Sequence, residues 1–204
     1  MIKNNNGGSC SIKSNNNAGG SVRIIGIDPG SIYTGWGILD SVQFGRKIKL
    51  VSIGLIDAKK YTYPNNLALI FTELKQIIEE YRPAIMVIES VFLGLNPSSL
   101  IKLSQARGAI CLLSSLYGIS LKEYAPRYIK KNVAGYGGAD KEAVRRMVYN
   151  FIKELNDVDV SASDTESDTE NRKNCGRDAK PLNNNVSDAL SAAICCATDM
   201  SNYV

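Results

Sequence analysis

The chain has 204 residues, 44% of them hydrophobic, and its 24 basic and 20 acidic residues give a net charge of +4. This length and composition predict one globular domain with tails, and the mildly basic balance is compatible with a nucleic-acid partner. The chain contains no histidine, which excludes Ser-His-Asp and Cys-His nucleophiles, imidazole bases and His-ligated zinc. If the chain is an enzyme, carboxylates and hard metal ions must carry its chemistry.

The five cysteines show no C-x-x-C spacing, so neither a zinc site nor a disulfide framework is indicated. The chain lacks an apolar run of membrane-spanning length, and its N-terminal segment is rich in Asn, Gly and Ser. We therefore expect a cytoplasmic protein without a membrane association. Residues 1–21 form a polar, low-complexity tail that is predicted to be disordered.

The first predicted strand, Arg23–Ile27, is β-branched and is followed directly by an acid and a turn, Asp28-Pro29-Gly30. A second strand over Gly35–Leu39 follows at hairpin spacing, and a third is predicted over 47–56. Asp28 therefore lies where a buried strand meets a turn. One interpretation is that it only caps the turn at Gly30, and the other is that it is a functional carboxylate.

The same pattern recurs at Glu89, which ends a continuous apolar run, Ala84–Ile88, typical of a strand that is covered on both faces. A charge at the end of such a strand must lie near water or a metal ion. The remaining elements follow from helical periodicity and from Pro and Asn start signals. They are helices over 65–81, 97–117, from Pro126, over 140–155 and over 184–200, and a strand over 119–124.

An acidic stretch separates the last two predicted helices. Residues 157–170 contain six acids and no base, so the rest of the chain carries +10. This composition predicts an insertion loop over about 157–181 rather than packed structure. The final helix then brings Asn185 and Asp188, which are three residues apart and share one helical face.

Two acids at strand ends and one on a late helix are what two-metal phosphodiester hydrolysis requires. Metal ions about 3.5–4 Å apart need several converging carboxylates to activate water and to stabilise the leaving oxygen. Asp28, Glu89 and Asp188 are the candidates, and Asn185 could offer a neutral oxygen to the same ions.

Four motifs in order, G-I-D-P-G-S-x-x-T-G-W-G, V-I-E-S-V-F, L-S-Q-A-R-G and V-S-D-A-L, resemble the RuvC family of Holliday-junction resolvases. The resemblance runs from about residue 23 to 155 and resumes at 184. It implies an α/β, RNase H-like fold, a mixed five-stranded sheet flanked by helices, in a single nuclease domain over 22–204. It also implies a homodimer that makes paired, symmetric nicks in a four-way DNA junction during recombination and repair. Two Mg²⁺ ions per site, with Mn²⁺ as a substitute, and a branch-migration complex as a further partner are implied as well.

Position by position, the resemblance makes Asp28 and Glu89 the first two family carboxylates, and Asp188 the acid on the final helix. Lys130 and Lys141 fall on basic positions near the DNA and the active site, with Lys141 in a catalytic role. Phe92 matches an aromatic residue that holds the opened junction, and its alternative interpretation is a core aromatic.

The chain departs from the family pattern at Asn185, where the family has Asp or His, and in the acidic insertion. A junction-binding protein with impaired catalysis is therefore an alternative to an active nuclease. A third hypothesis is a phosphotransferase of the actin and sugar-kinase superfold, which also begins with a G-I-D-x-G hairpin. That superfold needs two such domains, and the chain has one copy.

Overall fold

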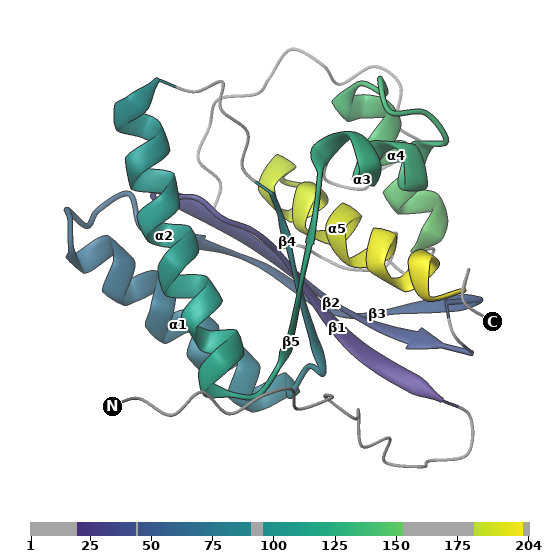
Figure 1. Ribbon diagram of the computed structural model, residues 1–204, viewed down its shortest axis with the longest axis horizontal. Helices are drawn as coiled ribbons and strands as arrows, with labels where there is room; N and C mark the ends of the chain where they lie inside the picture. The colour runs from purple at the N-terminus through teal and green to yellow at the C-terminus, as the bar shows by residue number, and fades with distance from the viewer. Residues whose placement is uncertain (1–19, 44, 91–95, 153–181, 202–204) are drawn as a thin grey trace, which may run out of the picture.

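The computed structural model describes residues 20–43, 45–90, 96–152 and 182–201, which form one five-stranded sheet with helices on both faces (Figure 1). The strand order is β3-β2-β1-β4-β5. Strands β1, β2 and β3 pair antiparallel, whereas β4 pairs parallel with β1 and with β5. All ten predicted elements are confirmed, in the predicted order: β1 (Ser21–Asp28), β2 (Tyr33–Val42), β3 (Lys47–Asp57), α1 (Asn65–Tyr81), β4 (Ile85–Glu89), α2 (Pro97–Leu116), β5 (Ser120–Tyr124), α3 (Pro126–Ala134), α4 (Lys141–Phe151) and α5 (Asn184–Ser201).

Pairing between neighbours sets the strand ends more than local propensity does. Strands β1 and β2 pair continuously from Ser21 opposite Val42 to Asp28 opposite Gly35. Both strands are therefore longer than predicted, and Ser21 belongs to the sheet rather than to the tail. Helix α4 ends at Phe151, with Ile152 as its C-cap, short of the predicted residue 155.

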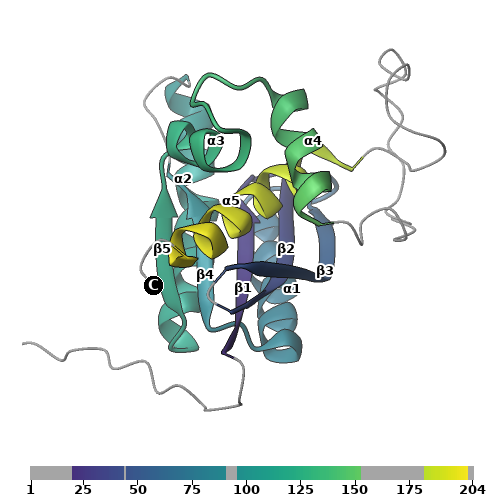
Figure 2. The same ribbon diagram turned by 90° about the vertical axis from the view of Figure 1, so that its right-hand side faces the viewer.

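The sheet has one helical layer on each face. Helices α1 and α2 cover one face, and α5 crosses the other face with α3 and α4 outside it (Figures 1 and 2). Because side chains alternate along a strand, Ile25 and Ile27 of β1 pack in the core on the α1 and α2 side, whereas Ile24 packs in the core on the α5 side. In β4, Ile88 follows the first pattern and Val87 the second. The same alternation directs the final residue of each strand toward α5.

Helix α5 packs so closely on β1 and β2 that a side chain at either of two strand positions would clash with the backbone of the helix. A Cβ atom on Gly26 would lie 2.0 Å from the Ala189 carbonyl oxygen, and one on Gly35 would lie 2.2 Å from the Asn185 carbonyl oxygen. Glycine at these two positions is therefore a packing requirement. Since α3 and α4 cover the outer side of α5, residues 189–197 are all buried, and the single apolar face predicted for this helix is too narrow.

Three predicted features lie outside the described residues: the N-terminal tail up to residue 19, the Phe92 loop and the acidic insertion over about 157–181. In the described part of the chain, no helix has the length and apolar character needed to cross a membrane.

Candidate active site

Two of the predicted carboxylates end neighbouring strands. Strands β1 and β4 run parallel with Ile27 opposite Ile88, so Asp28 and Glu89 follow side by side at the same edge of the sheet. Both residues continue the alternation that faces α5. Asp188 comes from the first turns of α5, one residue before the Ala189 carbonyl that lies against β1. The topology therefore brings three acids that are distant in sequence to one edge.

The pKa values of these acids show that they share one site. Burial, assisted by the nearby Asp188 and Glu89 carboxylates, raises the pKa of Asp28 to about 7, and Lys141 opposes this shift. The pKa of Glu89 is raised by burial and by Asp188, and that of Asp188 is raised by burial. Three mutually repelling carboxylates thus lie partly desolvated at one edge of the sheet, where a bound cation would relieve their repulsion.

Both predicted lysines lie beside these acids. Lys141 begins α4, whose N-cap residue Asp140 accepts a hydrogen bond from the Ala143 amide at 2.7 Å. Its Nζ lies 3.7 Å from Asp188 Oδ2, and its side chain is 74% exposed, so it can also reach a ligand. Lys130, half-buried on α3, opposes the rise in the pKa values of Glu89 and Asp188. The two cations offset part of the negative charge.

Asn185 lies in the first turn of α5. Its backbone carbonyl oxygen faces Gly35, which is the cross-strand partner of Asp28. Its backbone N–H donates to Asn183 Oδ1 at 2.9 Å. Within the described residues, no hydrogen bond holds its side-chain amide. The structure thus places Asn185 near the acids by its backbone, and its part in metal binding stays a prediction. Phe92 lies outside the described residues.

Sequence reasoning assigned no role to Arg107, which contacts the same edge from α2. One guanidinium nitrogen donates to the Glu89 carbonyl oxygen at 2.5 Å, and another pairs with Glu123 Oε1 of β5 at 2.8 Å. The side chain is only 13% exposed. One sequence feature could have identified Arg107. It lies in a helical stretch that also carries the buried Ala106 and Ile110, and an arginine buried there needs polar partners.

The acids fit a hard divalent cation. All three offer carboxylate oxygens, and the pKa of Asp28 is raised by burial first and then by the neighbouring Asp188 and Glu89 carboxylates, so a bound cation would stabilise the ionised form. In the described part of the chain, no group of three or more Asp, Glu, Cys or His side chains is gathered tightly enough to hold one ion. This spread is compatible with Mg²⁺, which keeps several waters and binds through one or two carboxylates together with substrate phosphates.

Comparisons with known proteins agree with this geometry. The family model for the crossover junction endodeoxyribonuclease RuvC matches residues 24–166. The chain belongs to the RuvC family. It is 44% identical to the RuvC of Hydrogenovibrio crunogenus over 142 residues, which is 70% of this chain and 81% of that protein. It is 40% identical to the RuvC of Methylococcus capsulatus over 142 residues, or 70% of this chain and 84% of that one.

Solved structures of Holliday junction resolvases share the fold. Thermus thermophilus RuvC in complex with a Holliday junction substrate superposes with a TM-score of 0.67 at 19% identity, covering 89% of this chain and 96% of that chain. The yeast mitochondrial Holliday junction resolvase Ydc2 superposes with a TM-score of 0.57 at 11% identity, covering 89% and 81%. The expected RNase H-like fold is therefore confirmed, and the family is one of hydrolases, the crossover junction endodeoxyribonucleases.

Proposed function

We propose that this protein resolves four-way DNA junctions by metal-dependent hydrolysis of phosphodiester bonds in two symmetric strands. The observation that carries the proposal is the placement of Asp28, Glu89 and Asp188 at one sheet edge beside Lys130 and Lys141. Membership of the RuvC family supports the choice of a junction as substrate.

Each group at this edge has a proposed task. Asp28, Glu89 and Asp188 hold two Mg²⁺ ions, with Mn²⁺ as a substitute. Bound there, the ions supply Lewis acidity for water activation and for the leaving oxygen. Lys141, exposed and next to Asp188, is placed to offset charge on the phosphate as it reacts. Lys130 favours the ionised carboxylates, because its charge opposes the rise in the pKa values of Glu89 and Asp188.

A homodimer would let two such sites act on the two-fold symmetry of a junction. The exposed side of α2 supports this part of the proposal. Ile101, Leu112 and Leu116 are 59%, 52% and 63% exposed, and space is open above Gly108 on the same helix. Their spacing puts them along one side of the helix, which a second copy can cover. We expect Leu112→Glu to yield a monomer in analytical ultracentrifugation and to replace paired nicks by single ones.

The test of the function is cleavage of a labelled four-way junction and of a linear duplex with the same arm sequence, each with and without Mg²⁺. The proposal expects two symmetric nicks in the junction only when the metal is present, and an intact duplex. Glu89→Gln is the matched control, since it is nearly isosteric and removes one carboxylate. Equal cleavage of the duplex, or cleavage by Glu89→Gln, would contradict the proposal.

A second candidate is a junction-binding protein with impaired catalysis, which Asn185 favours because a neutral amide stands where the family has Asp or His. Tight junction binding without Mg²⁺-dependent cleavage would support this candidate. A branch-migration complex as partner remains a prediction from the family resemblance, and a cytoplasmic location remains a prediction from the composition of the sequence.

A further inference from the structure

Beside the candidate active site, five exposed residues gather at the ends of β1 and β3. Ile32 follows β1, and its side chain is 51% exposed. The segment between β3 and α1 carries Lys59 and Lys60, both exposed, together with Tyr61 and Tyr63, which are 50% and 65% exposed. We name these five residues the rim surface.

The rim surface lies at the catalytic edge of the sheet. Strand β2 begins with Tyr33 opposite Asp57, the last residue of β3, and Gly35 of β2 pairs with Asp28. The chain therefore leaves β3 at the same edge at which β1 presents Asp28, two strands away (Figure 1). A DNA arm whose phosphate reaches Asp28 would therefore lie near this surface.

Hydrogen bonds to backbone carbonyl groups hold the backbone of the rim surface in place. The Ala58 amide donates to the Ile32 carbonyl at 2.8 Å, and Asn66 Nδ2 donates to the Ser31 carbonyl at 2.9 Å, which joins the two loops. The Tyr61 amide donates to the Ala58 carbonyl at 3.0 Å. A surface that is ordered before binding loses less entropy when a ligand arrives.

The charge of the rim surface suits a phosphate backbone. Its only acidic neighbour in the adjoining described residues 56–66 is Asp57, whose Oδ1 accepts from the Lys59 amide at 2.8 Å. The three active-site carboxylates repel phosphate, so cations are needed on each side of them. Lys130 and Lys141 lie on the α5 side, and Lys59 and Lys60 lie on the β3 side.

We propose that the rim surface binds the sugar-phosphate backbone of a junction arm next to the scissile phosphate, with Lys59 and Lys60 on phosphates and Tyr61 and Tyr63 on sugars or unstacked bases. This inference rests on the proposed function and adds a second contact surface to the site. Lysine and tyrosine are common phosphate and stacking partners in DNA interfaces.

The test measures junction binding in metal-free buffer at several salt concentrations. K59A/K60A should weaken binding by about tenfold at low salt and reduce the slope of log K against log salt by about 2, one for each lost phosphate contact. The matched control is K47A/K49A, which removes two exposed lysines from the start of β3, whereas Lys59 and Lys60 follow its end. This control should leave the slope within about 0.5 of the wild-type value.

A second variant guards against a general charge effect. Y61A/Y63A should weaken binding several-fold with an unchanged salt slope, and thermal melts should show that each variant is folded. Equal effects of K59A/K60A and K47A/K49A, or wild-type binding by both rim variants, would overturn the inference. If wild-type protein binds the junction through this surface yet never cuts it with Mg²⁺, the proposed function fails and the inference stands.

Discussion

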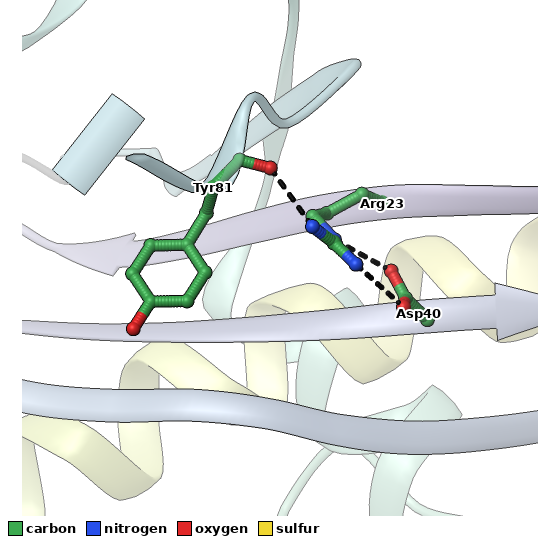
Figure 3. A network of polar contacts seen from close by, with 3 residues as sticks. All are labelled: Arg23, Asp40 and Tyr81. Carbon is green, nitrogen blue, oxygen red and sulfur yellow. Dashed lines mark hydrogen bonds and ion pairs between the residues drawn. The ribbon is translucent and has the colours of Figure 1, made fainter. Parts of the chain in front are cut away.

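Strand β1 carries one charged side chain near each end, and the fold treats the two in opposite ways. Arg23, near the start, forms a two-pronged pair with Asp40, its cross-strand partner, at 2.8 and 2.9 Å (Figure 3). Its third contact is to the Tyr81 carbonyl at the end of α1, at 3.0 Å. The Asp28 carboxylate, at the other end, lies near two further acids and accepts no hydrogen bond from the described residues.

The contrast separates a stabilising charge from a functional one. At the Arg23 end each ion meets its opposite, and the hydrogen bond to Asp40 raises the pKa of the arginine. At the Asp28 end burial and neighbouring acids raise the pKa of the carboxyl to about 7. Carboxylates that destabilise one another persist only when the surrounding fold holds them, and such clusters are typical of functional sites.

Asp28→Asn should break the functional end with the largest effect. It removes a carboxylate that would bind a metal ion together with the two neighbouring acids. We therefore expect Mg²⁺-dependent junction cleavage to fall by at least about a thousandfold, which corresponds to about 4 kcal/mol of barrier. Junction binding in metal-free buffer should be unchanged. Cleavage rates and filter binding measure the two effects, and retained nicking by this variant would rule out Asp28 as a metal ligand.

Arg107→Ala should give the next largest loss. It removes the donor to the Glu89 carbonyl and leaves Glu123 unpaired, so the end of β4 is less firmly placed. We expect cleavage to slow about thirtyfold, or about 2 kcal/mol, and the Mg²⁺ concentration for half-maximal rate to rise.

Arg107→Lys is the control, since it keeps the charge but not the fork and should recover only part of the rate. A change in thermal stability with an unaltered Mg²⁺ dependence would mean that Arg107 is structural only.

Asn185→Asp should act in the other direction. A carboxylate three residues before Asp188 would add negative charge to the proposed site for divalent ions. We expect the Mg²⁺-dependent cleavage rate to rise by about tenfold, equivalent to about 1.4 kcal/mol, with metal-free junction affinity unchanged or slightly lower. An unchanged rate would show that Asn185 is an adequate ligand or none.

The raised pKa of Asp28 also predicts how the stability of the fold depends on pH in metal-free buffer. The pKa of Asp28 is higher in the folded chain than in the unfolded chain, so between about pH 4 and about pH 7 the folded state holds more protons. Stability should therefore fall as pH rises through this window, by about 2 kcal/mol once solvent screening is allowed for. Asp28→Asn should flatten the profile in urea melts, and added Mg²⁺ should stabilise wild type above pH 7. An identical profile for both proteins would contradict the raised pKa.

The sequence predicted the elements because their signals are local. Asn96 and Pro97 start α2 as expected, with the Asn96 side chain accepting from the Ser99 amide at 2.8 Å. Asp28 and Glu89 were predicted because an acid at the end of an apolar strand is conspicuous, and Asp188 was predicted from its place on the final helix and from the family resemblance. Their convergence depends on the parallel pairing of β1 and β4, which no local signal in the sequence specifies.

Tertiary contacts escaped prediction. The bond from Arg107 to Glu89 joins residues on different elements, and no periodicity marks it. The burial of α5 on all sides depends on α3 and α4, which cover it from outside. The first residues of β1 looked like tail, because Ser21 gains its strand conformation from its partner Val42.

Arg23→Ala tests the end of β1 at which each charge is paired. It should leave cleavage unaltered, because Arg23 lies five residues from Asp28 along the strand, at the opposite edge of the sheet. The loss should appear in stability alone. The pair is two-pronged and charge-assisted, but the arginine side chain is 37% exposed, so water recovers part of the lost interaction. We expect about 1–2 kcal/mol from urea melts. Arg23→Lys should lose part of this, since an ammonium cannot contact both Asp40 oxygens and the Tyr81 carbonyl in one plane. If Arg23→Ala slowed cleavage as Arg107→Ala is expected to do, the two ends of β1 would be coupled, and the separation between stabilising and functional charge would be wrong.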